Sequence, residues 1–232
     1  MLNGDAGCQG TGSCAPLLCW QSCGPQAMRT AAPWSACLPP GVTALVDASG
    51  DEAQHWLPVL AAHSALQTAA DATAPSGHQQ PLHASSVAWL PASAAAQQAE
   101  QAVGEWLQTW CQSWPQWDEA AWQCHVAGFA LQAQLGKPLT HLSTGTWRKL
   151  QLAAMLASGA TLTLIDAPTA GLDQASVRYL AQALQALGDA VASQRLPQRW
   201  VLVAHWEPLP GVDWQQVLHL PPCWMAPEPS ST

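Results

Sequence analysis

Residues 162–173, LTLIDAPTAGLD, begin with a short and nearly continuous apolar run. Two more such runs occur, VTALV at 42–46 and WVLVA at 200–204. Apolar runs of this length are typical of strands that are buried on both faces of a parallel sheet. Each run is followed directly by a polar residue: Asp47, Asp166 or His205. Because ligands of parallel sheets bind outside the carboxyl ends of the strands, we expect these three side chains at a functional edge.

Segments in which apolar residues recur at helical spacing separate these runs. The helical segments are 53–66, 92–135 (divided at Pro115), a stretch directly after Thr146, and 175–187. A short strand is expected at 87–90 and a polar loop at 70–84. Strands that alternate with helices predict the α/β class, with a parallel sheet flanked by helices.

Two features have a structural interpretation only. Trp106, Trp110 and Trp114 recur every four residues, and we expect this stripe to be buried, because a base-stacking surface needs basic neighbours. The first 40 residues predict one or two strands and hold clustered cysteines without a CxxC pair. Since the eight cysteines are few for a chain of this size, we expect reduced thiols and no metal or redox site.

The composition excludes some classes of protein. The chain has 232 residues, of which 49% are hydrophobic and only 9% charged, so it is not a charge-rich disordered protein. Its formal net charge of −8 argues against nucleic acid as a partner, because binding to a phosphate backbone requires basic residues. The sequence shows neither a secretory signal nor an apolar run of 18 residues, and we expect no transmembrane segment.

The stretch from Leu142 to His205 resembles the nucleotide-binding subunit of ABC transporters. LSTGT at 142–146 is similar to the LSGGQ signature, LTLIDAPTAGLD to the Walker B strand with its D-loop, and VLVAH at 201–205 to the switch-histidine strand. The resemblance implies a single P-loop NTPase-like domain over 1–232, with a small N-terminal β part and an inserted helical subdomain. The expected parts are 1–91 (N-terminal β and core), 92–141 (helical subdomain), 142–220 (core with the motifs) and 221–232 (tail).

The resemblance also implies roles for individual residues. Ser143, Thr144 and Gly145 stand at a predicted helix start, where backbone amides and the helix dipole attract phosphate oxygens. The Walker B match makes Asp166 a magnesium ligand, and the switch match makes His205 a hydrogen-bond donor to a terminal phosphate. Asp173 is expected at a dimer interface. Arg148 and Lys149 follow the signature, and we expect them on the solvated surface.

The loop after VTALV departs from the family pattern. A phosphate loop, GxxxxGK[ST], uses glycines to let amides wrap the phosphates, a lysine to neutralise them and a hydroxyl to reach magnesium. Residues 47–54 are DASGDEAQ, so the first glycine, the last glycine, the lysine and the hydroxyl are replaced by Asp47, Glu52, Ala53 and Gln54. Two like charges about 4 Å apart cost about 4 kcal/mol at an effective dielectric near 20. We therefore expect three carboxylates to line this loop and to exclude ATP phosphates.

Two other positions depart from the family in the same half of the site. Ala167 stands where the family has its catalytic glutamate, and Ala92 where it has the Q-loop glutamine. The half of the site that a subunit builds for its own nucleotide is therefore lost, whereas the signature that serves a partner's nucleotide is kept.

These departures predict a degenerate ABC transporter ATP-binding subunit. It would supply its signature in trans to a catalytic partner cassette and help to couple ATP to a membrane permease. ATP and Mg²⁺ would bind in a composite site with the partner, and neither is expected to bind the isolated chain. The resemblance places such a subunit in the cytoplasm, peripheral on the inner face of the plasma membrane. The alternative is a non-catalytic regulatory or interaction protein, or a decaying paralogue, that binds no nucleotide. A third hypothesis, hydrolysis by the chain alone, would require a substitute for the lysine of the phosphate loop.

Overall fold

A computed structural model describes residues 16–23, 29–30, 34–67, 80–83, 86–92, 101–221 and 223–224. At its centre is a five-stranded sheet in the order β10-β4-β9-β8-β7. The strands are β10 (Gln216–His219), β4 (Gly41–Val46), β9 (Trp200–His205), β8 (Leu162–Asp166) and β7 (Val87–Leu90). Every neighbouring pair is parallel. The predicted α/β class is therefore confirmed.

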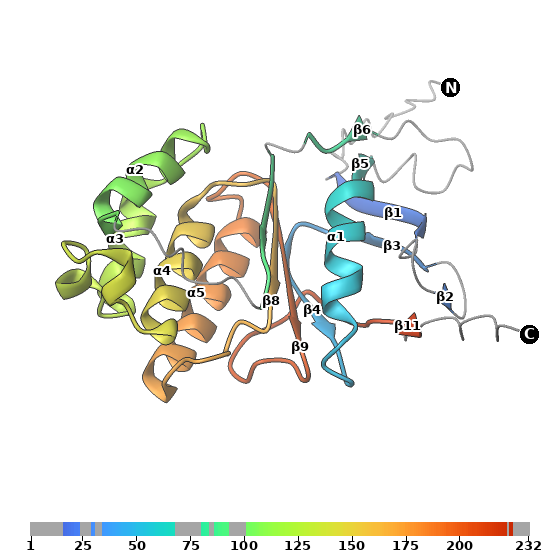
Figure 1. Cartoon of the computed structure of the whole chain (residues 1–232). Coiled ribbons are helices and arrows are strands. Elements are labelled where there is room, and N and C mark those ends of the chain that lie inside the picture. The colour runs from blue at the N-terminus through green and yellow to red at the C-terminus, as the bar shows by residue number, and fades with distance from the viewer. Residues whose placement is uncertain are drawn as a thin grey trace, which may run out of the picture.

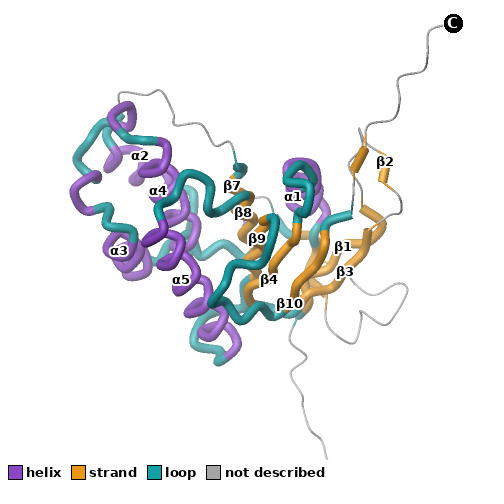
Figure 2. The backbone as a smooth tube through the Cα atoms, turned by 90° about the horizontal axis from the view of Figure 1, so that it is seen from below, coloured by secondary structure: helices purple, strands orange, loops and turns teal. Residues whose placement is uncertain are grey.

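Helices cover both faces of this sheet (Figure 1). On one face lies α1 (Ala53–His63), and on the other lie α4 (Thr144–Ala157) and α5 (Gln174–Ala192). Figure 2 shows the same division from below. Alternate residues of a strand point to opposite faces, so in β9 Val201 and Val203 enter the core beneath α4 and α5, while Leu202 enters the core beneath α1. Burial on both faces explains why these strands appear in the sequence as continuous apolar runs.

A second layer of helices lies outside α4 and is formed by α2 (Val103–Gln112) and α3 (Glu119–Gly128). They flank Pro115, as expected. Trp106 is buried, and Trp110 and Trp114 pack partly buried against the same core, although α2 ends two residues before Trp114. Two short 3₁₀ helices, Gln132–Gln134 and Leu139–His141, lead back toward α4.

The N-terminal part forms an antiparallel sheet on the far side of α1. Its order is β3-β1-β5-β6, with β3 (Trp34–Leu38), β1 (Leu17–Cys23), β5 (Ala65–Gln67) and β6 (Gln80–Pro81). A two-residue strand, β2 (Arg29–Thr30), pairs with β11 (Cys223–Trp224). The region thus holds more strands than the one or two expected. Edge-to-face contacts join Trp34 to both Trp20 and Trp56, and these contacts fix the sheet against α1.

The expectation of reduced thiols is wrong for one pair of cysteines. Cys19 and Cys37 lie directly opposite each other on β1 and β3 and form a disulfide. Cys111 and Cys124 are free thiols, whereas Cys8 and Cys14 lie outside the described residues. The pairing depends on strand register, which cysteine spacing alone does not reveal.

The boundaries of two predicted helices also change. The first helix ends at His63, and Ala65 already belongs to β5, because Ser64 adopts an extended conformation. The helix expected at 175–187 extends to Ala192. Most of the loop expected at 70–84 lies outside the described residues.

Candidate functional site

The carboxyl ends of three neighbouring strands meet at one edge of the parallel sheet. Asp47 directly follows β4, Asp166 ends β8, and His205 ends β9, which lies between them. A cavity of about 260 Å³ opens at this edge. Its lining includes Asp47, Gly50, Asp166, Thr169, His205 and Trp206. The structure thus brings together the three polar residues that the sequence placed at a functional edge.

The loop after β4 closes around the side chain of Asp47, which is 3% exposed. Its Oδ1 atom accepts hydrogen bonds from the Gly50 amide at 2.9 Å and from the Ser49 hydroxyl at 3.1 Å. Its Oδ2 atom accepts a bond of 2.9 Å from the amide of Ala53, the first residue of α1. Amides at the start of a helix are the groups with which phosphate loops bind anions. A carboxylate of the chain itself therefore occupies the anion-binding end of α1.

This arrangement corrects the expected one. Of the three acids predicted to line the loop, Asp47 faces inward, Asp51 is exposed to solvent, and Glu52 is the half-buried residue before α1. Repulsion among three acids is thus not the main feature of the loop. Its amides are instead engaged by one of those acids.

Asp166 is 7% exposed at the end of β8. Its Oδ2 atom accepts a long hydrogen bond of 3.4 Å from the amide of Ala92. Ala92 therefore lies beside this acid, at the place where the resemblance expects a glutamine. Burial raises the pKa of Asp166, and the negative charge of Asp47 acts in the same direction, while the Ala92 amide and Arg148 oppose the shift.

The residues around Asp166 do not fit a magnesium–triphosphate group. Ala92 and Ala167 offer no side-chain ligand, and Gln54 is exposed on α1. Both carboxylate oxygens of Asp47 already accept hydrogen bonds from the loop. Among the described residues, no group of three or more His, Cys, Asp or Glu side chains is arranged to hold a metal ion. A single carboxylate without its usual partners is a weak magnesium ligand.

Arg148 organises this edge, which the sequence interpretation missed. The side chain is 4% exposed, not solvated as expected, and its guanidinium donates hydrogen bonds to the carbonyl oxygens of Pro91 (2.7 Å), Asp166 and Ala167 (3.2 Å). Burial lowers its pKa to about 10, so the side chain stays charged at neutral pH. One signal could have revealed it: Arg148 lies four residues before Leu152, on the buried side of α4.

Ala167 follows Asp166 with a φ of 41°, in the left-handed region that alanine rarely adopts. Its amide donates to the carbonyl of Ala204 at 2.9 Å, and its carbonyl accepts from Arg148 and from the amide of Ala170. These contacts hold the unusual backbone in place at the position where the resemblance expects a glutamate.

His205 has both ring nitrogens engaged within the chain. Nδ1 lies 2.8 Å from the carbonyl oxygen of Glu207, and Nε2 lies 2.8 Å from the hydroxyl of Thr169. Since a carbonyl only accepts, Nδ1 carries a proton, and Nε2 shares a hydrogen bond with the Thr169 hydroxyl. Both ring nitrogens are therefore occupied by partners within the chain. Trp206, 61% exposed, lies against the His205 ring at the mouth of the cavity.

The segment that matches the signature, in contrast to the loop after β4, begins with exposed residues. Ser143 is exposed and precedes α4, and its Oγ atom accepts a hydrogen bond of 3.2 Å from the amide of Thr146. The amides of Thr144 and Gly145 belong to the first turn, whose amides have no partner within a helix. A Cβ atom on Gly145 would lie 2.4 Å from the carbonyl oxygen of Gly171, so glycine is required there for close contact with the D-loop segment.

Asp173 joins the signature helix to α5 within the same chain. Its Oδ1 atom accepts from the amide of Ser176 at 2.8 Å, which caps α5, and its Oδ2 atom lies 2.5 Å from Nζ of Lys149. The hydrogen bonds from Lys149 and from Ser176 hold the pKa of Asp173 well below its usual range. The Lys149 side chain is 17% exposed, which corrects the expectation of a freely solvated lysine.

Two of the solved structures to which this chain is similar are described as ATP-binding proteins or subunits of ABC transporters. A protein from Pyrococcus furiosus described as an ABC transporter ATP-binding protein has a TM-score of 0.65 and 15% identity, over 88% of this chain and 97% of its own. The chain has the fold of an ABC-type ATP-binding subunit. This confirms the predicted resemblance and fold class. The ATP-binding subunit of another ABC transporter gives a TM-score of 0.57 at 15% identity, over 82% of this chain and 79% of its own.

The ABC-type fold is not restricted to transporters. A chain from the complex of an archaeal ribosomal stalk protein with the archaeal ribosome recycling factor gives a TM-score of 0.54 at 17% identity, over 78% of this chain and 33% of that one. Among curated sequences, the cytochrome c biogenesis ATP-binding export protein CcmA of Ruegeria sp. (strain TM1040) is 39% identical over 61 residues. That match spans 26% of this chain and 30% of the CcmA length. No family model matches the chain. None of the described helices is long and apolar enough to cross a membrane.

Proposed function

We propose that this chain is a degenerate ABC transporter ATP-binding subunit that contributes its signature to a nucleotide held by a partner cassette. The observation that carries the proposal is the contrast between two helix starts. The amides of Thr144 and Gly145 start α4 beside the exposed Ser143, and the Ser143 side chain bonds only the later amide of Thr146. At α1, in contrast, the first amide is already bonded to the carboxylate of Asp47. The first two amides of α4 are therefore the ones that we assign to an external phosphate.

The proposal assigns ATP and Mg²⁺ to a composite site. The partner cassette supplies a phosphate loop, a magnesium ligand and a glutamate, and this chain supplies Ser143, Thr144 and Gly145. When bound, the nucleotide's terminal phosphate would bring negative charge to the positive end of α4. Asp166 and His205 lie at the carboxyl edge of the sheet, on the side of the loop that Asp47 occupies. We assign them no part in holding the partner's nucleotide.

The position of Asp173 agrees with this assignment. The residue stays 58% exposed beside the signature even though it caps α5 and pairs with Lys149. A partner that covers the start of α4 therefore also covers Asp173. The remaining components of such a system are a membrane permease and a cytoplasmic location at the inner face of the membrane, both of which follow from the family and not from the chain's own residues.

ATP hydrolysis by the mixed pair tests the proposal. The purified chain is combined with a candidate partner cassette, and the rate is compared with that of the partner alone. Ser143→Arg places a bulky cation at the start of α4 and should reduce the stimulated rate at least about a hundredfold, since one lost transition-state donor already costs about 100-fold to 1,000-fold.

A matched variant separates this loss from a general effect of arginine. Ser113→Arg makes the same change at another exposed serine, directly after α2, and should leave the stimulated rate unchanged. Equal rates for wild type and Ser143→Arg would contradict the proposal.

The second candidate is a non-catalytic regulatory or interaction protein that keeps the fold without any nucleotide. Two observations favour it. The Ser143 side chain caps α4, and Gly145 contacts Gly171, so both residues have a structural role within the chain. Titration calorimetry with ATP and magnesium, on the chain alone and with a partner, distinguishes the two. Heat from the mixture beyond that of the partner alone supports the first candidate, and a mixture that gives only the partner's own heat supports the second.

A further inference from the structure

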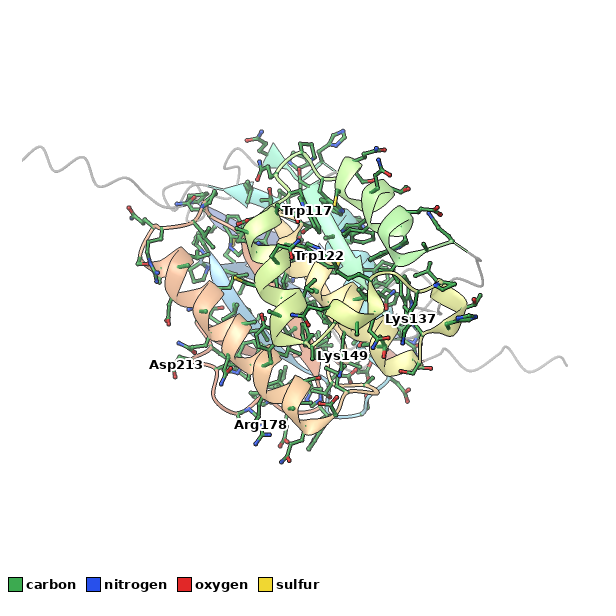
Figure 3. All side chains as sticks on the ribbon, turned by 90° about the vertical axis from the view of Figure 1, so that its left-hand side faces the viewer. Trp117, Trp122, Lys137, Lys149, Arg178 and Asp213 are labelled. Carbon is green, nitrogen blue, oxygen red and sulfur yellow. A yellow bond between two sulfur atoms is a disulfide. The ribbon has the colours of Figure 1, made fainter. Side chains whose placement is uncertain are left out.

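A second cavity lies far from the carboxyl edge of the sheet. Its volume is about 610 Å³, within the range of small-molecule sites, and its walls are mainly apolar. It opens between α3, α5 and residues 196–199, which lead into the amino end of β9. Figure 3 looks onto this side of the molecule, where α3 and α5 lie next to each other and Arg178 marks the outer edge of α5.

The cavity exists because small residues line both helices. On α5, Ala183 and Ala186 face it, and on α3, Ala121 does so. The two helices approach each other closely at Gly128, where a Cβ atom would lie 1.9 Å from the Tyr179 ring. Tyr179 thus holds the helices together at one end, while the alanines leave space at the other.

One wall of the cavity is rigid and polar. The Tyr179 hydroxyl lies 2.8 Å from Nδ1 of His125 and donates to the carbonyl of Cys124 at 3.2 Å, and its ring packs edge-on against Phe129. Burial lowers the pKa of His125 to about 4, and the charge of Arg199 acts in the same direction. The imidazole is therefore neutral at pH 7 and offers hydrogen bonding without a charge.

Arg199 brings a buried positive charge to the cavity, and its hydrogen-bond partners are neutral. It is 8% exposed and lines the cavity beside Leu156 and Leu187. Its guanidinium donates to the Leu156 carbonyl at 3.1 Å and to the Thr163 hydroxyl at 3.2 Å, both neutral groups, and its Nε atom has no partner among the described residues. Burial of a cation without an anion is unfavourable, and a ligand that brings a negative charge relieves this.

The charge of Asp118 acts on Arg199 and opposes the fall of its pKa, so it partly offsets the cost of burying the guanidinium. Asp118 also lines the cavity, but its carboxylate accepts the Ala121 amide at 2.9 Å as the cap of α3. The ion pair found among the described residues joins Lys149 to Asp173, not Asp118 to Arg199. Arg195 lies four residues before Arg199, and Asp189 lies six residues before Arg195. The case for an anion therefore rests on the buried guanidinium of Arg199, whose hydrogen-bond partners are neutral.

We propose that the cavity between α3 and α5 binds a small amphipathic carboxylate, with its apolar body along the alanine-lined walls and its carboxylate toward Arg199. Neither the site nor its ligand depends on the signature or on a partner cassette. Carboxylate binding here is therefore independent of the proposed function.

Decanoate and 1-decanol are suitable probes, because they share an apolar chain and differ in charge. Titration calorimetry on the full chain should show decanoate binding about tenfold tighter than decanol, in line with a charge-assisted hydrogen bond. Equal affinities, or no binding of either probe, would overturn the proposal.

Variants place the binding in the cavity. Ala183→Trp fills the space between the helices and should weaken decanoate at least about tenfold, whereas Ala175→Trp, on the exposed first turn of α5, should leave it unchanged. Arg199→Met should bring decanoate down to the level of decanol. Arg199 also bonds Leu156 and Thr163, so Arg199→Met can fail to fold. In that case Ala183→Trp decides the question. Decanoate binding that survives Ala183→Trp would contradict the assignment.

The two free thiols among the described residues give a local readout. Cys124 is exposed and lines the cavity, and Cys111 lies elsewhere, on α2. Saturating decanoate should slow the alkylation of Cys124 by N-ethylmaleimide about tenfold and should leave the alkylation of Cys111 unchanged. Peptide mass spectrometry measures both rates. An unchanged rate at Cys124 would count against the site.

Discussion

The starts of α1 and α4 are the same kind of structure in two different states. Both helices follow a short loop, and both have amides in the first turn that lack helical partners. At α1 the amide of Ala53 is bonded to the side chain of Asp47, six residues earlier. At α4 the cap is Ser143, a neutral residue that bonds only the amide of Thr146 among the first-turn amides and leaves the end of the helix exposed.

The difference shows how the chain itself can satisfy the amides at one helix start while another helix start stays exposed. The carboxylate of Asp47 accepts hydrogen bonds from the amides of Gly50 and Ala53. These two amides therefore need no bound anion. Under the proposed function, the loop after β4 and the start of α4 consequently differ in their relation to nucleotide.

Removal of Asp47 should produce the largest effect on stability. Asp47→Ala leaves the amides of Gly50 and Ala53 without their charged acceptor, and the free energy of unfolding should fall by about 3 kcal/mol, the value of one or two charge-assisted hydrogen bonds. Urea denaturation measures this change. Asp51→Ala, at an exposed acid of the same loop, should stay within about 0.5 kcal/mol. Similar losses for both variants would mean that Asp47 does not close the loop.

A methyl group at the signature glycine should have the next largest effect. The Cβ atom of Gly145→Ala would meet the Gly171 carbonyl at 2.4 Å, and the forced shift should destabilise the fold by about 2 kcal/mol. Gly104→Ala makes the same change at the matching second position of α2, where nothing lies within 4 Å, and should stabilise by up to about 1 kcal/mol. Thermal unfolding of the two variants in opposite directions is the expected result. A gain for both would show that the contact with Gly171 is loose.

A smaller, pH-dependent effect is expected at Asp166. Because burial holds the pKa of Asp166 above its usual range, the folded state binds the proton more tightly than the unfolded state, and stability falls as the pH rises through that range. Asp166→Asn removes the buried charge and should raise the free energy of unfolding at pH 7, with a gain that disappears toward pH 3. Denaturant unfolding at the two pH values measures it. A variant less stable than wild type at pH 7 would indicate that the carboxylate is held by more favourable contacts than those with Ala92 and Arg148.

The sequence predicted the parallel sheet because its signal is local. The apolar runs at 42–46, 162–166 and 200–204 become strands with nearly the predicted bounds, and the polar residues that follow them meet at one edge. Local patterns of this kind do not depend on distant contacts.

Other features depend on the folded backbone and were therefore not predictable. The inward position of Asp47 follows from the turn at residues 47–50, and the Cys19–Cys37 bond follows from strand register. Arg148 was placed on the surface because arginine is rarely buried, although its carbonyl partners compensate for burial here. The cavity lies between α3 and α5, which are more than forty residues apart in the sequence, so no local pattern predicts it.

Titration of the purified chain with ATP and magnesium tests the central claim most directly. Because Asp47 engages the amides of residues 50 and 53, we expect no saturable heat up to about 1 mM nucleotide. Any binding of ATP to the lone chain would then be weaker than a binding free energy of about −4 kcal/mol. Saturable binding by the lone chain that is lost when residues 47–54 are altered would show that the loop is open to phosphate, and the account would be wrong.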